Sequence, residues 1–352
     1  MACVVVWLEA LTGKQARLMH LVAEELERRG YETLVTAREY DYTVTVLRML
    51  GREPVVVGRY GGKTLRGKLL ASVERQLKLA RLVSKLSVEA HVCFTSPDSS
   101  RVAFGLGIPI LALSDSPHSH FVNRLSLPLA ERLVAPRCVP ADRFAKFIEV
   151  SRIVQFNGFF ELAWVLRARP TRAVLRELGL REGRYVVLRP EERYAAYYEG
   201  ESEEPTAIGA AIEAVPDDYD IVLFPRYPEQ RAYVEGRYGD RVIMPRESVD
   251  TVSLAYYSAL VVTGGSTLAQ EAALLGVRAI TYFPRELETA SEISRLGFPL
   301  TRVASPRELG DAVSAALSEG ARRVDVSHLL SKLEDPVPVI ADSAEEIAKR
   351  PR

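Results

Sequence analysis

A short, continuously apolar strand followed by an amphipathic helix recurs along this chain, and this alternation constrains the fold more than any other feature. Residues 4–8 predict a buried strand. Residues 14–30 predict a helix with four apolar residues on one face, Leu18, Leu21, Val22 and Leu26, and with Gly30 where a C-cap would fall. Strands that are apolar throughout are typical of a parallel sheet that helices cover on both faces.

The alternation stops once and then begins again, which predicts two domains. Further strands are expected in the first half at residues 33–36, 54–57, 90–94, 109–113 and 133–135, and in the second half at 185–188, 221–224, 241–243, 259–262 and 279–282. The Arg-rich segment around Pro170 has no clear strand, and we interpret it as the connector. A length of 352 residues also fits two domains of about 150 residues each.

The predicted fold class is therefore α/β, with two Rossmann-like, doubly wound parallel-sheet domains that face a cleft. We expect an N-terminal, acceptor-side domain at residues 1–160, a C-terminal domain that binds a nucleotide sugar at 161–335, and a tail at 336–352. In such sheets ligands bind at the carboxyl ends of the strands, so the loops that follow the strands are where functional residues are expected.

Composition excludes several classes of protein. The 46 Lys and Arg residues balance 46 Asp and Glu residues, which disfavours a general nucleic-acid binder. Cys3, Cys93 and Cys138 contain no Cys-x-x-Cys pair, so we expect neither a disulfide framework nor a zinc site, and we expect a cytoplasmic protein. No apolar run approaches the roughly 18 residues that span a bilayer, so neither a signal peptide nor a membrane anchor is expected.

The balance of particular residue types points to a source organism with one of two properties. The chain has 38 Arg against 8 Lys and only two Asn, which fits a heat-adapted organism in which labile amides are scarce. A GC-rich genome explains the excess of Arg equally well.

The strongest local motif is a glycine-rich turn between a predicted strand and a predicted helix. The turn consists of Gly264, Gly265, Ser266 and Thr267. Its glycines let the backbone approach a ligand closely, and the helix that follows directs free N–H groups at an anion such as a phosphate. Glu271, one turn later, would accept hydrogen bonds from ribose hydroxyls. The alternative is that the turn only starts a helix, with a capping box formed by Thr267 and Gln270.

Two arginines follow strands of the second half. Arg189 and Arg226 each stand at the carboxyl end of a predicted strand, where a guanidinium can pair with both oxygens of a diphosphate. The alternative is an ordinary surface arginine, which a chain with so many arginines provides often.

Polar residues also follow strands of the first half. Asp115, His118 and His120 come just after a buried strand, and a His beside a carboxylate can act as a general base at neutral pH. The alternative is that Asp115 and Ser116 cap the next helix and that the imidazoles are structural. Asp98 follows a neighbouring strand.

Gly13 and Lys14 follow the first strand, beside Thr12. We expect them either to contact a nucleotide phosphate or to form an ordinary helix start with an exposed lysine.

A predicted helix over residues 63–86 is strongly basic. It carries seven cationic residues against the single acidic residue Glu74: Lys63, Arg66, Lys68, Arg75, Lys78, Arg81 and Lys85. The apolar positions Leu69, Val73, Leu77, Ala80 and Val83 are expected to face the core, leaving Lys68, Arg75, Lys78 and Lys85 outside. From Lys63 to Lys85 the helix would then contact an anionic membrane or a lipid-linked acceptor, or it is a solvated helix face.

Several segments together resemble a known family. They are "LVTAREYDYT", "YGGKTLRGKLLASVERQ", "SDSPHSHFVNRLSLPLAERLVAPRCVP", "FNGFFELAWV" and "GGSTLAQEAALLGV". Over roughly residues 1 to 320 the chain resembles the mainly archaeal family catalogued as domain of unknown function 354. That family is similar to nucleotide-sugar enzymes of the GT-B type, such as UDP-N-acetylglucosamine 2-epimerase and the lipid-linked peptidoglycan glycosyltransferase. The resemblance implies that residues 264–267 hold the diphosphate and that Glu271 binds the ribose.

The chain also departs from the epimerases. They carry an Arg after the first strand and a His after the first strand of the second domain, where this chain reads "EALTGKQ" and "RPEERYAAYY". Asp98 and Asp115 do fall near the positions of the epimerases' catalytic carboxylates.

We therefore expect a glycosyltransferase that uses a nucleotide sugar, with no cofactor and no metal, and with Asp115, His118 or His120 as the base. A 2-epimerase that uses Asp98 and Asp115 is one alternative, and a non-catalytic nucleotide-sugar-binding protein is another. The expected setting is the cytoplasm, with a peripheral place at the inner face of the membrane and a homodimer as open options.

Overall fold

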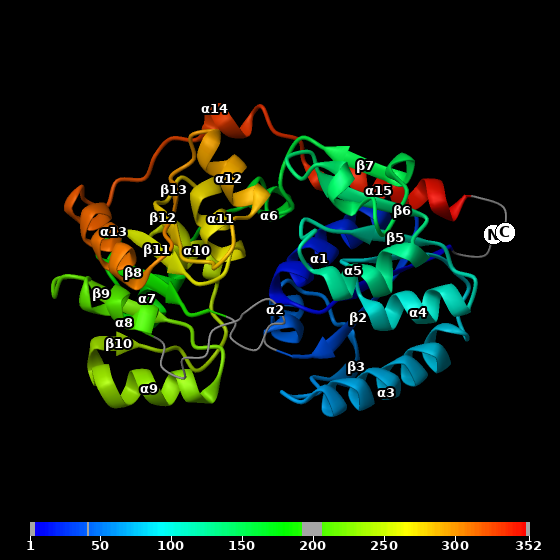
Figure 1. Ribbon diagram of the computed structural model, residues 1–352, viewed down its shortest axis with the longest axis horizontal. Coiled ribbons are helices and arrows are strands. Elements are labelled where there is room, and N and C mark those ends of the chain that lie inside the picture. The colour runs from blue at the N-terminus through cyan, green and yellow to red at the C-terminus, as the bar shows by residue number, and fades with distance from the viewer. Residues whose placement is uncertain (1–3, 41, 192–205, 350–352) are drawn as a thin grey trace. The chain divides into compact units, whose positions relative to one another are not determined.

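The computed structural model describes residues 4–40, 42–191 and 206–349, which form two compact units (Figure 1). Unit 1 comprises Met1–Leu166 and Glu334–Arg352, and unit 2 comprises Arg167–Leu333. Each unit contains one parallel sheet, and helices of the unit pack against it. The predicted fold class, two doubly wound α/β domains in series, is therefore confirmed.

Unit 1 is built on a seven-stranded sheet in the order β3-β2-β1-β4-β5-β6-β7. The strands are β1 Val5–Ala10, β2 Glu32–Glu39, β3 Val55–Arg59, β4 Val88–Cys93, β5 Ile110–Leu113, β6 Arg132–Pro136 and β7 Ile153–Phe156. The helices are α1 Gly13–Arg28, α2 Thr43–Met49, α3 Leu65–Val83, α4 Pro97–Gly105, α5 His120–Ser126, α6 Leu162–Val165 and α15 Pro336–Ala348, with short 3₁₀ turns at Leu127–Leu129, Ala141–Phe144 and Val150–Arg152.

Unit 2 is built on a six-stranded sheet in the order β10-β9-β8-β11-β12-β13. The strands are β8 Tyr185–Arg189, β9 Asp220–Leu223, β10 Val242–Ile243, β11 Leu260–Thr263, β12 Ala279–Thr281 and β13 Leu300–Arg302. The helices are α7 Ala173–Leu178, α8 Thr206–Glu213, α9 Pro228–Tyr238, α10 Thr251–Tyr256, α11 Thr267–Leu274, α12 Glu288–Arg295, α13 Pro306–Ser318 and α14 Ser327–Leu330, with a 3₁₀ turn at Gly239–Arg241.

The strand order of each sheet reverses direction once. In unit 1 the reversal lies between β1 and β4, and in unit 2 it lies between β8 and β11. Side chains that follow these strands are therefore placed where α/β sheets bind their ligands, just outside the carboxyl ends at the point of reversal.

The C-terminal segment, predicted to be a tail, is a helix of unit 1. α15 packs against α1 and against β4, β5 and β6. It buries Val337, Ile340, Ala344 and Ile347. Arg29, which directly follows α1, places its Nη1 atom 2.6 Å from Oδ1 of Asp342 in α15. The boundary between the units also lies at Leu166, not at residue 160, because α6 is buried in unit 1.

The predicted orientation of α3 is wrong. Arg75, expected outside, is 1% exposed, whereas Leu69, Val73 and Leu77, expected in the core, are 63%, 57% and 52% exposed. The face of α3 that packs on the unit carries Arg75, Leu79 and Val83. Arg75 is stable there because its guanidinium donates to the carbonyl of Val57 at 2.8 Å and pairs with the buried Glu9.

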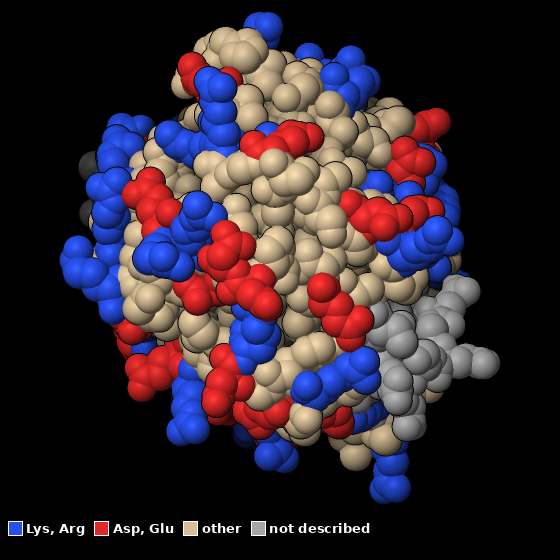
Figure 2. Space-filling view, turned by 90° about the vertical axis from the view of Figure 1, so that its left-hand side faces the viewer, with Lys and Arg blue, Asp and Glu red and all other residues tan. Residues whose placement is uncertain are grey.

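Over the described residues, no helix has both the length and the apolar character that a membrane crossing requires. Cys3 lies outside these residues, and Cys93 is buried, where burial raises the pKa of its thiol to about 11. Figure 2 shows acidic and basic side chains interleaved over the face it presents, as the balanced charge of the chain leads one to expect.

Candidate functional site

A buried cluster of charged side chains lies at the carboxyl ends of the strands of unit 1. Thr12 caps α1 by accepting a hydrogen bond from the Gln15 N–H, which places Lys14 in the first turn. The Lys14 Nζ atom lies 2.5 Å from Asp115 Oδ2 and 2.9 Å from Glu161 Oε1. The three side chains are only 14%, 10% and 1% exposed. Lys14 is therefore not the exposed lysine of the alternative prediction.

Aromatic rings enclose the same ammonium group. The Lys14 Nζ atom lies 5.3 Å from the ring centroid of Phe94 and 5.7 Å from that of Phe160, and these two rings meet edge to face. Little water reaches the cluster, so its electrostatic interactions are stronger than those of surface pairs.

The environment of the cluster shifts the three pKa values in different directions. Burial lowers the pKa of Lys14, but the charges of Asp115 and Glu161 outweigh burial and raise it above the ordinary lysine value. Burial raises the pKa of Asp115, and the charge of Lys14 outweighs it, so that this pKa is lowered. The pKa of Glu161 is raised, chiefly by burial. Asp115 is consequently an ionised carboxylate at neutral pH, whereas Glu161 is the carboxyl group that holds a proton more readily.

The two histidines predicted beside Asp115 differ in placement. His118 is close enough for its charge to contribute to the lowered pKa of Asp115. His120 is exposed as the first residue of α5, and its ring packs against Phe147 at 5.2 Å. The N-cap of α5 is Ser119, so Asp115 does not cap this helix as the alternative prediction had it. The structure thus brings Asp115 to Lys14 and His118 near Asp115, whereas the exposed His120 packs against Phe147.

Sequence reasoning missed Glu161 as a functional residue. Glu161 directly precedes α6 and is 0% exposed. Its neighbours Phe160 and Leu162 are apolar and equally buried. The available signal was a single acidic residue within the apolar run "FFELAWV", because a carboxylate in such a run requires a buried partner.

A second buried cluster contains Asp98. The carboxylate of Glu9 lies 2.6 Å from Arg75 Nη2 and also accepts from the hydroxyl of Thr36. Asp98 Oδ2 lies 3.7 Å from Arg75 Nη1, while Asp98 Oδ1 accepts from Ser72 at 2.5 Å. Asp98 is thus held by residues of α3 and belongs to the cluster of Glu9 and Arg75.

The backbone between β4 and α4 is strained beside both clusters. Thr95 has φ of 42°, in the left-handed region that residues other than glycine rarely adopt. It stands between Phe94, which covers Lys14, and Ser96, whose hydroxyl lies 3.4 Å from Glu9. Such strain persists where the surrounding structure requires one particular placement of side chains.

In unit 2, the glycine-rich turn packs against the segment that follows β8. The N–H of Gly264 donates to the carbonyl of Arg189 at 2.9 Å. A Cβ atom on Gly264 would lie 2.6 Å from both the backbone nitrogen and the Cβ of Glu191. Gly264 is thus required by the approach of the protein's own backbone.

Gly265 lies beside Arg226. Its N–H donates to Thr263 Oγ1 at 3.0 Å, its carbonyl accepts from Thr281 Oγ1 at 2.9 Å, and a Cβ atom on it would lie 3.1 Å from Arg226 Nη2. Arg226 is oriented by a 2.9 Å hydrogen bond from its Nε to the carbonyl of Pro190. The structure thereby brings the turn and the arginine together, as the sequence predicted.

The same edge of unit 2 carries further polar groups. Tyr282 donates its hydroxyl hydrogen to Glu191 Oε2 at 2.9 Å, and Gln230 donates to the Glu191 carbonyl at 3.1 Å. Arg189 ends β8 directly opposite Thr263. Beyond Glu191, the loop that corresponds to the His-bearing loop of the epimerases runs into residues 192–205, outside the described part of the chain.

The helix after the turn starts without a side-chain cap. α11 begins at Thr267, and its N-cap Ser266 makes no side-chain capping bond. The predicted capping box is wrong, because the side-chain amide of Gln270 donates to Thr289 Oγ1 at 2.9 Å. Glu271 is 3% exposed on the buried side of α11. The start of α11 retains N–H groups that an anion could accept from.

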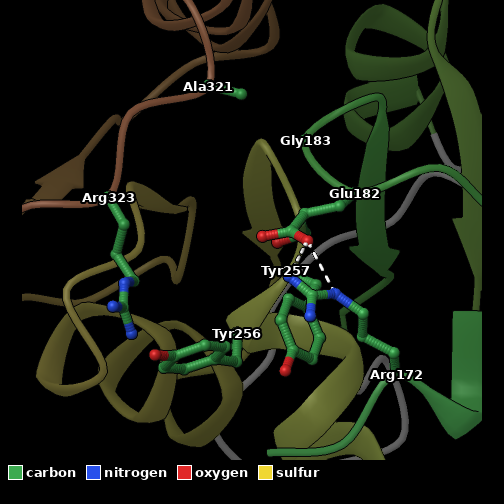
Figure 3. Close-up of a pocket in the computed structure, with 8 residues that line it drawn as sticks. Arg172, Glu182, Gly183, Tyr256, Tyr257, Ala321 and Arg323 are labelled. Carbon is green, nitrogen blue, oxygen red and sulfur yellow. Dashed lines mark hydrogen bonds and ion pairs between the residues drawn. The ribbon is translucent and has the colours of Figure 1, made fainter.

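A pocket of about 250 Å³ occurs elsewhere in unit 2 (Figure 3). Arg172 pairs there with Glu182 at 2.8 Å, and the Arg323 guanidinium lies 3.9 Å from the ring centroid of Tyr256. Gly183, which also lines it, precedes β8, so the pocket lies toward the amino ends of the strands. It contains none of the predicted site residues.

Comparison with known proteins places the chain in a family. Residues 4–349 match the family described as "Protein of unknown function (DUF354)". The chain belongs to this family. An uncharacterized protein of Methanocaldococcus jannaschii is 27% identical over 290 residues, which cover 80% of this chain and 82% of that protein.

Solved structures share the fold of this family member at low sequence identity. The UDP-GlcNAc 2-epimerase of Neisseria meningitidis, bound to UDP-GlcNAc, matches with a TM-score of 0.74 and 14% identity over 97% of this chain and 98% of that one. The Anabaena protein HepE, in complex with UDP and glucose, matches with a TM-score of 0.62 and 15% identity over 98% and 99%. The resemblance to GT-B-like epimerases and glycosyltransferases is thus confirmed for the fold.

Proposed function

We propose that this protein binds a nucleoside diphosphate sugar and transfers the sugar to a hydroxyl group of an acceptor, without a metal ion. The observation that carries the proposal is the uncapped start of α11 beside the guanidinium of Arg226. Free N–H groups at a helix start and a cation favour a diphosphate. As the sugar bond breaks, the leaving diphosphate gains charge, which these groups would stabilise.

Residues of unit 2 would divide the recognition of the nucleotide. We assign the diphosphate to Gly265, Ser266, Thr267 and Arg226, with Gly264 shaping the turn and Arg189 at the neighbouring strand end. Glu271 remains the proposed partner of the ribose, which rests on the family resemblance. The solved relatives that carry UDP or UDP-GlcNAc support this class of ligand.

The buried cluster of unit 1 would carry the acid–base chemistry. Asp115 is ionised at neutral pH because Lys14 lowers its pKa, and its charge would hold a protonated His118 after that imidazole has taken the acceptor's proton. Glu161 would position Lys14, and through it Asp115. We leave His120 out of this role because it lies outside the cluster.

A second candidate function is epimerisation of the sugar at C2. It is favoured by the structural match to UDP-GlcNAc 2-epimerases, and by the presence of carboxylates after two adjacent strands, Asp98 after β4 and Asp115 after β5. In the structure Asp115 pairs with Lys14, and Asp98 lies 3.7 Å from Arg75. Transfer requires an acceptor, whereas epimerisation proceeds without one and exchanges the hydrogen at C2 with solvent.

Calorimetric titration with UDP-GlcNAc and other nucleotide sugars tests the binding proposal. In Gly265→Val the added side chain meets Arg226, and we expect binding to be lost. Gly236→Val is the matched control, because a Cβ atom at Gly236 meets nothing within 4 Å. Equal affinity of the two variants for every nucleotide sugar that binds the wild type would refute the assignment.

Turnover then tests the chemistry. Asp115→Asn and His118→Ala should lower kcat with little change in nucleotide affinity, while His120→Ala should keep the wild-type kcat. Reaction in D2O without acceptor separates the two activities, since deuterium at C2 of the sugar appears only with epimerisation.

A further inference from the structure

The helix α3 exposes a row of large apolar side chains. Leu65, Leu69, Val73 and Leu77 recur every four residues and are 52–85% exposed, and Leu70 beside them is 59% exposed. A spacing of four residues keeps such side chains on one slowly turning stripe of a helix. An apolar stripe of this length on a surface helix indicates a site of contact with another protein or with a membrane.

Neighbouring helices of unit 1 also expose large apolar side chains. α3 packs against α4, and α4 packs against α5, as Figure 1 also shows, with α4 between the other two. Phe104 at the end of α4 is 58% exposed, and Phe121 and Leu125 on α5 are 69% and 61% exposed. We call this surface of α3, α4 and α5 the α3 face.

The charged residues of the α3 face are almost all cationic. Its exposed cations are Arg66, Lys78, Arg81, Lys85, Arg101 and Arg124. Within α3 the acidic residue is Glu74, which is paired with Lys78 at 2.6 Å. The whole chain has no net charge, so this local excess of cations is not a property of its composition.

The α3 face cannot turn its apolar side chains inward. The opposite side of α3 is fixed by the buried pair between Arg75 and Glu9, and by the burial of Leu79 and Val83. Rotating the helix to bury Leu69 and Val73 would break that pair and leave a charge unpaired in the core, which is strongly unfavourable. The exposed leucines are therefore a permanent feature of the fold.

We propose that the α3 face docks this protein onto the surface of an anionic lipid bilayer. Leucine and phenylalanine side chains enter the boundary of the acyl chains, while lysine and arginine contact lipid phosphates. A second copy of the chain fits this face less well, because a two-fold interface would place the cation-rich surfaces of both copies against each other. The proposal is independent of the reaction that the protein catalyses.

Cosedimentation with vesicles tests the proposal. The wild type is expected to pellet with vesicles of 70% phosphatidylcholine and 30% phosphatidylglycerol, and much less with phosphatidylcholine alone. The combined variant L69Q/V73Q/L77Q should bind at least about tenfold more weakly than the wild type, because it loses apolar side chains that would enter the bilayer. Added salt should weaken binding of the wild type only in part, since the apolar contribution is not screened.

A matched control uses exposed apolar residues away from the α3 face. V150Q/L166Q/V324Q replaces three side chains of 50%, 39% and 42% exposure, and it should bind vesicles as the wild type does. Equal melting temperatures of all three proteins would show that binding changes are not folding changes. A wild type that does not pellet, or equal binding of the two triple variants, overturns the proposal. So does a wild-type dimer that L69Q/V73Q/L77Q converts to a monomer without any vesicle binding, which would assign the face to a second copy.

Discussion

Replacing Lys14 by methionine removes the ammonium group that pairs with two buried carboxylates. Methionine retains the apolar stem of lysine beside Phe94 and Phe160, so the change is chiefly electrostatic. Asp115 and Glu161 would then lie together, 10% and 1% exposed, without the ammonium group that pairs with both. Breaking a buried ion pair in this way costs about 3–5 kcal/mol of the free energy of unfolding. For a unit of this size that corresponds to a fall in melting temperature of roughly 6–20 °C.

The effect has a defined dependence on pH. In the variant, both carboxyl groups avoid charge only by binding protons, so their pKa values rise above those of the unfolded chain. A raised pKa contributes stability at low pH, and this contribution is lost as the pH rises through the folded-state value. The deficit of Lys14→Met relative to the wild type should therefore be large at pH 8 and smaller at pH 5. Scanning calorimetry at the two pH values measures it.

A matched lysine on the surface provides the control. Lys78 also pairs with a carboxylate, at 2.6 Å from Glu74, but it is 54% exposed. Lys78→Met should change the free energy of unfolding by less than about 1 kcal/mol, with little dependence on pH. If Lys14→Met is no less stable than Lys78→Met at pH 8, the cluster is not desolvated and the reasoning above is refuted.

Two further predictions concern single residues. Gly264→Ala should destabilise unit 2 by several kcal/mol in urea unfolding, because its Cβ would lie 2.6 Å from Glu191. Gly236→Ala, whose Cβ would meet nothing within 4 Å, should stabilise the unit by about 0.5–1 kcal/mol. Similar changes in the free energy of unfolding for the two variants would contradict the close approach of Gly264 to Glu191. His91 is fully buried against Trp7, and burial lowers its pKa to about 3. Between pH 7 and 5 the imidazole of His91 binds a proton in the unfolded chain but not in the folded one. This difference should lower the free energy of unfolding of the wild type by about 2 kcal/mol over that range. His91→Gln should lack this contribution to the pH dependence.

The sequence was informative wherever local pattern decides structure. β1 and β8 are almost entirely buried, and residues 5–8 and 185–188 within them read as unbroken apolar runs, so the positions of these strands could be predicted. β7 and β13 lie at the edges of their sheets and were not predicted as strands. β13 has only three residues, of which Thr301 and Arg302 are exposed, so it carries no apolar run.

Features that depend on contacts between residues far apart in the sequence could not be predicted. The four-residue spacing in α3 was recognised correctly as a stripe, but which side of the helix is buried depends on Glu9, in a strand far away along the chain. An arginine in a basic helix normally faces solvent. Likewise Lys14 could be placed after β1, but its contact with Glu161 requires the tertiary fold. The strand, turn and helix around Gly264 and Gly265 could be predicted because these elements are adjacent in sequence.

The return of α15 to unit 1 makes the whole of unit 2 an insertion within that unit. As the chain emerges from the ribosome, unit 2 is finished while unit 1 still lacks its last helix. Residues of α15 such as Ile340 and Ile347 pack beside α1 only after the whole of unit 2 has been made. Until then, α1 and part of the first sheet expose apolar surface to solvent and to other nascent chains. Synthesis of α15 is therefore the step that completes the packing of α1, the helix that carries Lys14.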